Sequence, residues 1–291
     1  MIRERSDTLF QWINGIVMIL VSLTMIAPMI HLLAISLSSS VHAEARAVYL
    51  WPKGFNVDVY KSLFTMGDMW RAMGVSVWIT FAGTLLCLAL TSSISFCLAR
   101  PQMPGRTLLT RLILFSFIFP APLIPTFLVV KNLGLVNTLW ALIIPSALGA
   151  YYVFIMRTFF RSISNELIEA SKIDGCGELG VFIRMVLPMS KPVLATIALF
   201  HAVSQWNSYF AALIYIRSRP LHPLQLKLRS LIVEGDANSG MDAQNFDAGS
   251  LQTPEVIKAA AILFSTLPIL IVYPMLQKYF VKGAMLGSLK E

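Results

Sequence analysis

Charged residues are scarce in this chain. Asp, Glu, Lys and Arg make up 13% of its 291 residues, whereas soluble domains carry about 25%. Hydrophobic residues account for 56% of the chain, and its mean hydropathy is +0.70. Because so few charges cannot cover a water-facing surface, the composition excludes an ordinary soluble domain and predicts one polytopic membrane domain.

Residues for covalent, metal or nucleotide chemistry are also few. The three cysteines, Cys87, Cys97 and Cys176, have neither the spacing of metal ligands nor that of a disulfide framework. The sequence contains no H-E-x-x-H metal motif and no Walker A motif G-x-x-x-x-G-K-[ST]. These absences argue against a membrane-embedded enzyme and predict that any ATP hydrolysis resides on a separate polypeptide.

A nucleic-acid partner is not expected. The net charge is +8, but the bases are scattered singly along the chain and form no basic stripe. In a membrane protein, scattered bases of this kind are better explained as determinants of orientation.

Six apolar runs are long enough to cross a bilayer. A hydrocarbon core about 30 Å thick requires about 20 mostly apolar helical residues. The sequence therefore predicts an all-α membrane protein with six transmembrane helices. The predicted spans cover approximately residues 12–37, 74–98, 108–130, 139–160, 193–216 and 259–281. The first run is about twice the length of a signal-peptide core, so we expect an uncleaved span.

The distribution of bases predicts that both termini lie in the cytoplasm. With the N-terminus inside, 13 of the 23 Lys and Arg residues fall on the inner side. These inner bases lie in short loops close to span ends, where positive charge determines orientation. The segment 161–192 is then cytoplasmic, and the segment 217–258 is an extracytoplasmic loop that we expect to fold against the outer surface.

The cytoplasmic segment 161–192, called the hairpin below, contains the sequence ELIEASKIDGCGELGVFIRMVLPMSKP at residues 166–192. Asp174-Gly175 is a helix-stop signal between two short predicted helices, because Gly adopts a left-handed conformation without steric cost. The first helix places Leu167, Ala170 and Ile173 on one face. The second carries Leu179, Phe182, Ile183 and Val186, and Leu187-Pro188 ends it. The pattern alone fits either docking into a groove of a soluble partner or an amphipathic loop lying on lipid headgroups.

The hairpin resembles the EAA motif of ABC-importer permeases. The matching residues are Glu169, Ala170, Ser171, Asp174, Gly175, Cys176, Phe182, Leu187 and Pro188. Ser171 and Cys176 stand where alanine is usual, and both are small. The resemblance extends over nearly the whole chain to the smaller permease subunit of carbohydrate importers of the maltose-permease type. Segments such as WNSYFAALIY (206–215) and KYFVKGAMLGSLKE (278–291) support it, and the latter is similar to permeases for alginate and pectin fragments.

This resemblance implies a type I ABC-importer permease fold in the bacterial inner membrane. It also implies a second, larger permease, two ATP-binding subunits, an extracytoplasmic solute-binding protein and a carbohydrate substrate. ATP and Mg would be bound by the partner ATPase subunits, and this chain would bind no cofactor. In the hairpin, Gly175 would form the bend, Glu169 and Asp174 would be polar anchors, and Phe182 and Leu187 would fill apolar pockets of the ATPase.

The fifth predicted span carries a candidate substrate path. His201, Ser204, Gln205 and Ser208 recur at helical spacing on one face, flanked by Asn207 and Tyr209, with Trp206 more distant. Polar groups in lipid are costly, so these side chains should face the helix bundle or a cavity. Aromatic rings commonly stack on sugars, but hydrogen bonding between spans explains the polar residues equally well. Both interpretations stay open at this point.

The alternative function is an ATP-independent secondary transporter or channel for a small polar solute. Such proteins usually show charged or broken helices at the bilayer midplane and often inverted repeats. Neither feature is evident in this sequence. His31, in the first predicted span, is a further ionisable group within the membrane and a weaker functional candidate.

Overall fold

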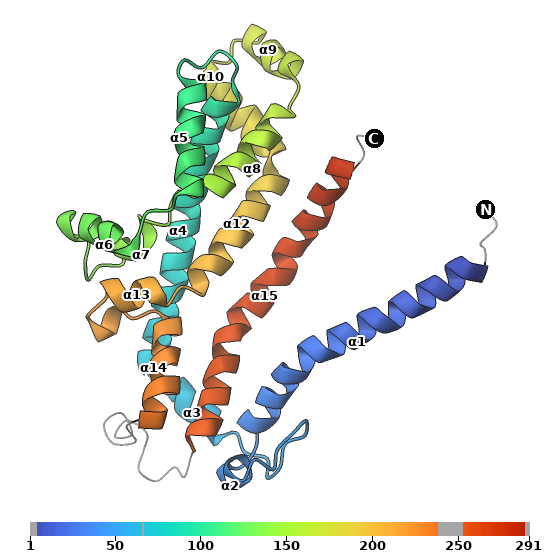
Figure 1. Ribbon diagram of the computed structural model, residues 1–291, viewed down its shortest axis with the longest axis vertical. Helices are drawn as coiled ribbons and strands as arrows, with labels where there is room; N and C mark the ends of the chain where they lie inside the picture. Colours follow the sequence, from blue (N-terminus) through green and yellow to red (C-terminus); the bar gives the residue numbers. More distant parts are fainter. Residues whose placement is uncertain (1–4, 66, 238–252, 289–291) are drawn as a thin grey trace. The chain divides into compact units, whose positions relative to one another are not determined.

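The computed structural model describes residues 5–65, 67–237 and 253–288, and within these ranges the chain is helical and contains no strand (Figure 1). The all-α prediction is confirmed. By its contacts the chain divides into two compact units, the first comprising residues 1–70 and 228–267 and the second residues 71–227 and 268–291.

The first unit is held together by aromatic and hydroxyl contacts. It contains α1 (Arg5–Ser36), α2 (Ser40–Glu44) and α3 (Asp58–Thr65), together with parts of α14 (Leu224–Ala237) and α15 (Pro254–Ser288). The rings of Phe64, Trp70 and Phe264 lie within 5.9 Å of one another, a spacing typical of favourable aromatic pairs. His31 hydrogen-bonds through Nδ1 to the carbonyl oxygen of Tyr49 at 2.6 Å. A structural role therefore accounts for this histidine.

The second unit contains the helices that position the hairpin. Three of them run side by side: α4 (Gly67–Ala99), α8 (Ala150–Arg161) and α12 (Lys191–Trp206) (Figure 1). Ser95 Oγ of α4 donates to the carbonyl oxygen of Val153 in α8 at 3.1 Å. The remaining helices are α5 (Arg106–Ile118), α6 (Leu123–Asn132), α7 (Trp140–Ile143) and α13 (Phe210–Tyr215), and a 3-10 turn covers Arg219–Leu221.

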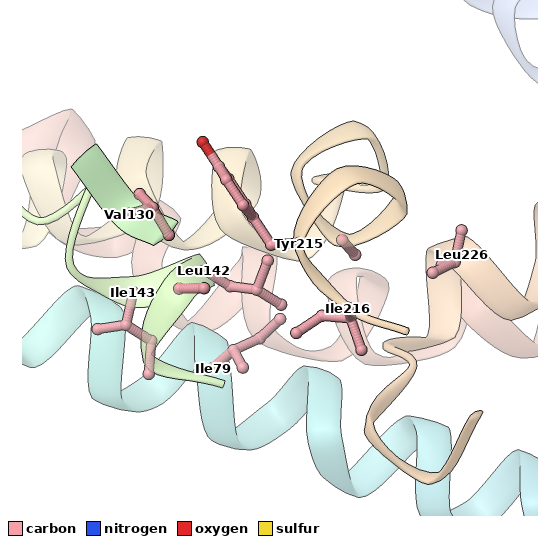
Figure 2. Close-up of a cluster of buried hydrophobic side chains, with 9 residues drawn as sticks. Ile79, Val130, Leu142, Ile143, Tyr215, Ile216 and Leu226 are labelled. Carbon is pink, nitrogen blue, oxygen red and sulfur yellow. The ribbon is translucent and has the colours of Figure 1, made fainter. Parts of the chain in front are cut away.

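An apolar cluster joins pieces of chain that are distant in sequence (Figure 2). It comprises Ile79, Val130, Ala141, Leu142, Ile143, Ala212, Tyr215, Ile216 and Leu226, which come from α4, α6, α7, α13–α14 and the chain between them. Ile143 is fully buried and Ile79 is 1% exposed. Burial of one such side chain contributes about 1.5–3 kcal/mol in a soluble core. The cluster therefore fixes the short helices α7 and α13 against α4.

The predicted spans are only partly continuous helices. Among the described residues, three apolar helices are long enough to cross a membrane unaided, namely Phe10–Ser36, Gly67–Ala99 and Pro254–Pro274. Two further pairs qualify only as bent spans: α5 with α6 at 116°, and Glu178–Met189 with α12 at 77°. Counted in this way, the structure offers three to five candidate spans.

The predictions for 108–130, 139–160 and 193–216 as single helices are wrong. The first breaks between Ile118 and Leu123, where Pro120 and Pro122 cannot donate a backbone hydrogen bond. The second consists of α7 and α8, separated by residues 144–149. The third stops at Trp206 and resumes at Phe210. Hydropathy registers the apolar length of these runs but not the breaks within them.

Candidate functional site

The hairpin folds as two short helical arms around a glycine turn. Its first arm is α9 (Asn165–Ile173), whose N-terminus is capped by Ser164: its Oγ accepts from the backbone N–H of Glu166 at 3.2 Å. The turn contains Gly175 with φ of +86°, the left-handed conformation predicted for this residue. A β-carbon at this position would strain the backbone, so the sequence requires glycine here.

The second arm is less regular than predicted. It runs through α10 (Glu178–Gly180), a π-helical turn at Val181–Val186 and α11 (Leu187–Met189). Helical structure therefore continues through Pro188 and does not end at Leu187-Pro188 as the sequence suggested. π-turns are uncommon and occur frequently at functional sites.

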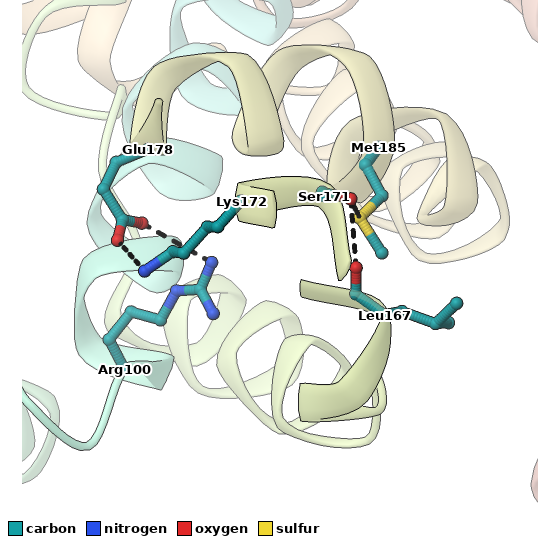
Figure 3. Close-up of polar contacts among 6 residues, drawn as sticks. All are labelled: Arg100, Leu167, Ser171, Lys172, Glu178 and Met185. Atoms are coloured by element: carbon teal, nitrogen blue, oxygen red, sulfur yellow. Dashed lines mark hydrogen bonds and ion pairs between the residues drawn. The ribbon is translucent and has the colours of Figure 1, made fainter. Parts of the chain in front are cut away.

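Ionic contacts tie the two arms to each other and to α4 (Figure 3). Lys172 Nζ donates to Glu178 Oε1, and Arg100 Nη2 lies 3.6 Å from Glu178 Oε2. The hydrogen bond from Lys172 lowers the pKa of Glu178, partial burial opposes this effect, and the charges of Lys172 and Arg100 lower the pKa further. Ser171 Oγ lies 3.0 Å from both the Leu167 carbonyl oxygen and Met185 Sδ. The hairpin is thus a folded unit in which each arm contacts the other.

The outer surface of the hairpin is unusually apolar. Four large hydrophobic side chains are exposed: Leu167 at 47%, Ile173 at 87%, Leu179 at 69% and Ile183 at 52%. The motif residues Glu169, Ala170, Asp174 and Pro188 are exposed beside them, whereas Ser171, Cys176 and Leu187 are half-buried. Clustered exposed apolar side chains outside lipid mark an interaction surface.

Phe182 has a different position from the one that the motif implied. It is half-buried, and its ring centroid lies 4.9 Å from that of Phe96 in α4. It belongs with the buried side chains Ile168, Val181 and Val186, which pack under the hairpin. Phe182 therefore supports the hairpin from inside, and the exposed apolar side chains are left to contact a partner.

In α12, His201 and Gln205 are occupied by hydrogen bonds within the protein. His201 Nδ1 lies 3.2 Å from Thr84 Oγ1 of α4, and Nε2 lies 3.2 Å from the carbonyl oxygen of Ser146. Gln205 Nε2 donates to the carbonyl oxygen of Leu142 at 2.8 Å, and its Oε1 accepts from Ser146 Oγ at 3.2 Å. Leu142 lies in the last turn of α7 and Ser146 in the break between α7 and α8, where carbonyl groups lack helical partners, whereas Thr84 belongs to α4. The two side chains therefore serve the interhelical bonding that the sequence left open.

The other predicted path residues do not gather on one face. Because α12 ends at Trp206, Ser208 and Tyr209 belong to the connection to α13. Asn207 is exposed, and its Nδ2 donates back to the Val203 carbonyl oxygen at 2.9 Å. Ser204 is exposed as well. Trp206 is 6% exposed and lines an apolar cavity of about 320 Å³ between α4, α12 and α15, which offers little to a polar sugar.

Three functional contacts were missed by sequence reasoning. Thr84 and Ser146 are isolated polar residues in apolar surroundings, so neither carried a periodic signal. Arg100 was interpreted only as an inner base, yet it lies over the Phe96 ring at 4.6 Å and faces the hairpin. Only the tertiary structure brings these residues to their partners.

Comparison with known proteins identifies the class of this chain. A model of the family described as "Binding-protein-dependent transport system inner membrane component" matches residues 92–285. Since this match covers more than half of the chain, the chain belongs to that family. It is a permease component of ABC importers in the inner membrane and not an enzyme.

Individual relatives agree with this class along most of the chain. The chain is 44% identical to Protein LplC of Bacillus subtilis (strain 168), over 91% of this chain and 89% of that protein. It is 38% identical to the polygalacturonan/rhamnogalacturonan transport system permease protein YtcP of the same strain, over 94% and 95%. It also resembles a solved structure, that of a bacterial ABC transporter involved in the import of the acidic polysaccharide alginate. That likeness has a TM-score of 0.88 and 31% identity, and it covers 95% of this chain and 98% of the other.

The comparisons confirm the type I importer permease fold that the EAA resemblance implied. They give no support to the alternative of an ATP-independent transporter or channel.

Proposed function

We propose that this chain is one of two permease subunits of an ABC importer for an oligosaccharide, and that the hairpin couples ATPase closure to movement of the spans. The observation that carries the coupling role is the set of four exposed apolar side chains on the hairpin, which lies outside the six spans predicted from the sequence. The partners in this proposal are a second, larger permease, two ATP-binding subunits that hold ATP and Mg, and a solute-binding protein. The hairpin faces the cytoplasm when the N-terminus is inside.

The hairpin has the features that a coupling joint requires. Its four exposed apolar side chains can fill a groove of a soluble partner, as in other helix-in-groove interfaces. Glu169 and Asp174 lie beside these side chains and would provide charged contacts. The ion pair from Arg100 to Glu178 and the ring contact from Phe96 to Phe182 connect the hairpin to the end of α4. Movement of the docked hairpin would therefore be transmitted to a long span.

We further propose that the oligosaccharide contains acidic sugars. Two of the proteins similar to this chain are named for transport of polygalacturonan or alginate, both of which are acidic polymers. Residues 216–229, which follow α13, contain Arg217, Arg219, His222, Lys227 and Arg229 and no acidic residue, whereas Glu234 and Asp236 lie farther along α14. Burial lowers the pKa of His222, the charges of Lys227 and Arg219 lower it further, and a backbone hydrogen bond to Ile216 opposes them, so the imidazole is favoured in its neutral form and the positive charge comes from the arginine and lysine side chains. A basic outer segment would attract a uronate and raise its local concentration.

Uptake by the reconstituted importer tests the substrate class. Proteoliposomes containing both permeases, the ATPase and the binding protein should accumulate a labelled oligogalacturonate with ATP and not without it. In Arg217→Gln we expect the KM for the oligogalacturonate to rise by about two- to fivefold, as for the loss of one exposed charge contact. Lys53→Gln removes an exposed base from a different segment and should leave KM unchanged. Uptake that does not depend on ATP would contradict the importer, and equal KM values in both variants would contradict the role of Arg217.

Association with the ATPase tests the coupling role. The double variant Ile173→Ser and Leu179→Ser should lose most of the ATPase that copurifies with the permease pair, because two exposed apolar contacts are removed. Val41→Ser is the matched control, since Val41 is 75% exposed on α2. Normal ATPase recovery with the double variant would return the hairpin to an ordinary amphipathic loop.

A further inference from the structure

A second site lies behind the hairpin, where α4 ends. A cavity of about 160 Å³ is formed there by the last turn of α4, the end of α8 and the start of the hairpin. Its polar lining comes from Arg100, Arg161 and Asn165, and Phe96 and Phe160 form apolar walls. The cavity has room for several waters at about 30 Å³ each, and hence for a small polar group.

Arg100 is incompletely paired in this cavity. Its side chain is 16% exposed, and its guanidinium lies over the Phe96 ring. Nη2 is 3.6 Å from the Glu178 carboxylate, beyond hydrogen-bond distance (Figure 3). Nε and Nη2 are both buried, and no acceptor among the described residues hydrogen-bonds to either. Buried guanidinium N–H groups without acceptors are costly, and an oxyanion is the ligand that matches them best.

The charges around the cavity also favour an anion. Arg161 lines the cavity, Arg106 begins α5, and neither forms an ion pair with a carboxylate of the described residues. Arg157 already donates from Nε to the Leu98 carbonyl oxygen at the end of α4. Glu178 is the one carboxylate that forms an ion pair with Arg100 in the described chain, and it is shared with Lys172. Positive charge therefore exceeds negative charge at this end of the helices.

We propose that this cavity binds the phosphate of an anionic phospholipid headgroup, held by Arg100 and Arg161. A lipid is favoured over free phosphate because α5 begins beside this cluster at Arg106 and exposes Leu108 and Leu112 along its length. An acyl chain can lie on these side chains while its phosphate occupies the cavity. Basic pockets at the ends of membrane helices bind lipid headgroups by this arrangement. The assignment to the inner leaflet rests on the proposed orientation, whereas the binding itself does not.

The site would link lipid composition to the hairpin. Arg100 contacts both the cavity and Glu178, and Asn165 is the first residue of α9. A bound phosphate would satisfy the buried Nε and Nη2 groups and hold the hairpin against α4. This role is distinct from contact with the ATPase, which uses the opposite, exposed surface of the hairpin.

Native mass spectrometry of the assembled importer tests the proposal. The delipidated complex is titrated with phosphatidylglycerol, with phosphatidylcholine of the same acyl chains, or with inorganic phosphate. We expect Arg100→Gln to weaken phosphatidylglycerol binding about tenfold, as for the loss of a charged hydrogen-bonding group. Asn165→Asp should do the same without removing any packing, because its carboxylate would compete for the two guanidinium groups. An acidic residue in the first turn of α9 is compatible with the helix dipole, so this second variant should fold even if Arg100→Gln does not.

Arg71→Gln is the matched control, because Arg71 is an exposed arginine near the other end of α4. Retained preference for phosphatidylglycerol in the wild type and in Arg71→Gln, with loss in the other two variants, is the expected result. Equal phosphatidylglycerol affinity in all four proteins would overturn the proposal. Displacement of the lipid by millimolar inorganic phosphate would overturn the lipid as the source of the phosphate. Neither result depends on transport, so failure here is distinguishable from failure of the proposed function.

Discussion

Single polar side chains supply hydrogen bonds to backbone groups at the ends of the interrupted helices. A helix end in an apolar environment leaves carbonyl groups without partners, and in lipid each such group is costly. Gln205 bonds to the carbonyl oxygen of Leu142, and Asn137 Oδ1 accepts from the backbone N–H groups of Arg217 and Ser218 at 3.0 and 2.9 Å. The polar residues of an otherwise apolar chain are therefore placed mainly where the backbone needs them.

Replacement of Gln205 by leucine should expose this requirement. The variant removes the hydrogen bonds from Gln205 to the Leu142 carbonyl group and to Ser146 Oγ and leaves only the shorter-range bonds from Ser146 Oγ to the carbonyl groups of Leu142 and Ile143, so we expect it to destabilise the protein by about 1–2 kcal/mol. Thermal unfolding of the purified permease in detergent measures the effect. Ser204→Ala changes an exposed neighbour in the same helix and should leave the unfolding midpoint unchanged. A loss of sugar affinity at normal stability would instead make Gln205 a substrate ligand.

Gly175 offers a second test at the level of one residue. Alanine in its left-handed conformation costs about 1 kcal/mol, although open space surrounds the position. Gly175→Ala should therefore lower ATPase stimulation by the binding protein while total expression stays normal. Gly180→Ala is the control, because Gly180 has φ of −63° and a β-carbon there makes only ordinary contacts. If Gly180→Ala is as defective as Gly175→Ala, the turn conformation is not the cause.

At the scale of elements, the hairpin was more predictable than the spans. The Asp174-Gly175 stop and the two flanking arms were evident in the sequence because turn chemistry is local. The breaks at residues 119–122, 144–149 and 207–209 were not, since hydropathy averages over about twenty residues. The partners that make those breaks tolerable, such as Thr84 and Ser146, are more than fifty residues from His201 and Gln205. Local patterns cannot reveal a hydrogen bond that only tertiary contact creates.

The ion pair between the two arms predicts a pH dependence. Lys172 holds the pKa of Glu178 below its ordinary value of 4.5, so the unfolded hairpin binds a proton more readily than the folded one. The pair's contribution to stability is therefore present above pH 4.5 and is lost as the pH falls through the folded pKa. Because both side chains are about half exposed, the contribution is at most about 1 kcal/mol.

Comparison of wild type with Glu178→Gln measures this contribution. The unfolding midpoint of the wild type should fall more steeply than that of the variant as the pH falls below 4.5, and the two should run parallel above it. Glu169→Gln removes an exposed carboxylate from α9 and should keep the wild-type pH profile. Parallel profiles for wild type and Glu178→Gln would show that the pair contributes nothing.

For the whole molecule, orientation relative to the membrane is the property on which most of the proposals depend. With the N-terminus inside, residue 53 faces the extracytoplasmic side and residue 166 the cytoplasm. Both side chains are exposed, so Lys53→Cys and Glu166→Cys should react readily with a membrane-impermeant thiol reagent.

The reagent should label Lys53→Cys when it is added to right-side-out spheroplasts, and Glu166→Cys when it is added to inverted membrane vesicles. Both substitutions are made in a Cys176→Ser background, because Cys176 is half-buried in the hairpin on the same side as residue 166, whereas Cys87 is buried and Cys97 lies in α4 within the apolar run. Labelling of both positions from the same side would contradict the six-span topology, and exchange of the two sides would reverse the orientation.

The short pieces of broken span have a consequence for how the protein is made. At 1.5 Å per residue, the 12 residues of α8 extend about 18 Å and the 4 residues of α7 about 6 Å, well short of a hydrocarbon core of about 30 Å. Neither piece is long enough to remain in the bilayer by itself as it leaves the ribosome. The carbonyl groups of Leu142 and Ser146, in α7 and in the break after it, gain their hydrogen bonds from Gln205 and His201 only when those residues have been synthesised, some forty residues after α8 ends. Until then, a nascent chain that pauses before α12 holds an unfinished segment at the translocon, and truncation there should mark it for degradation by membrane quality control.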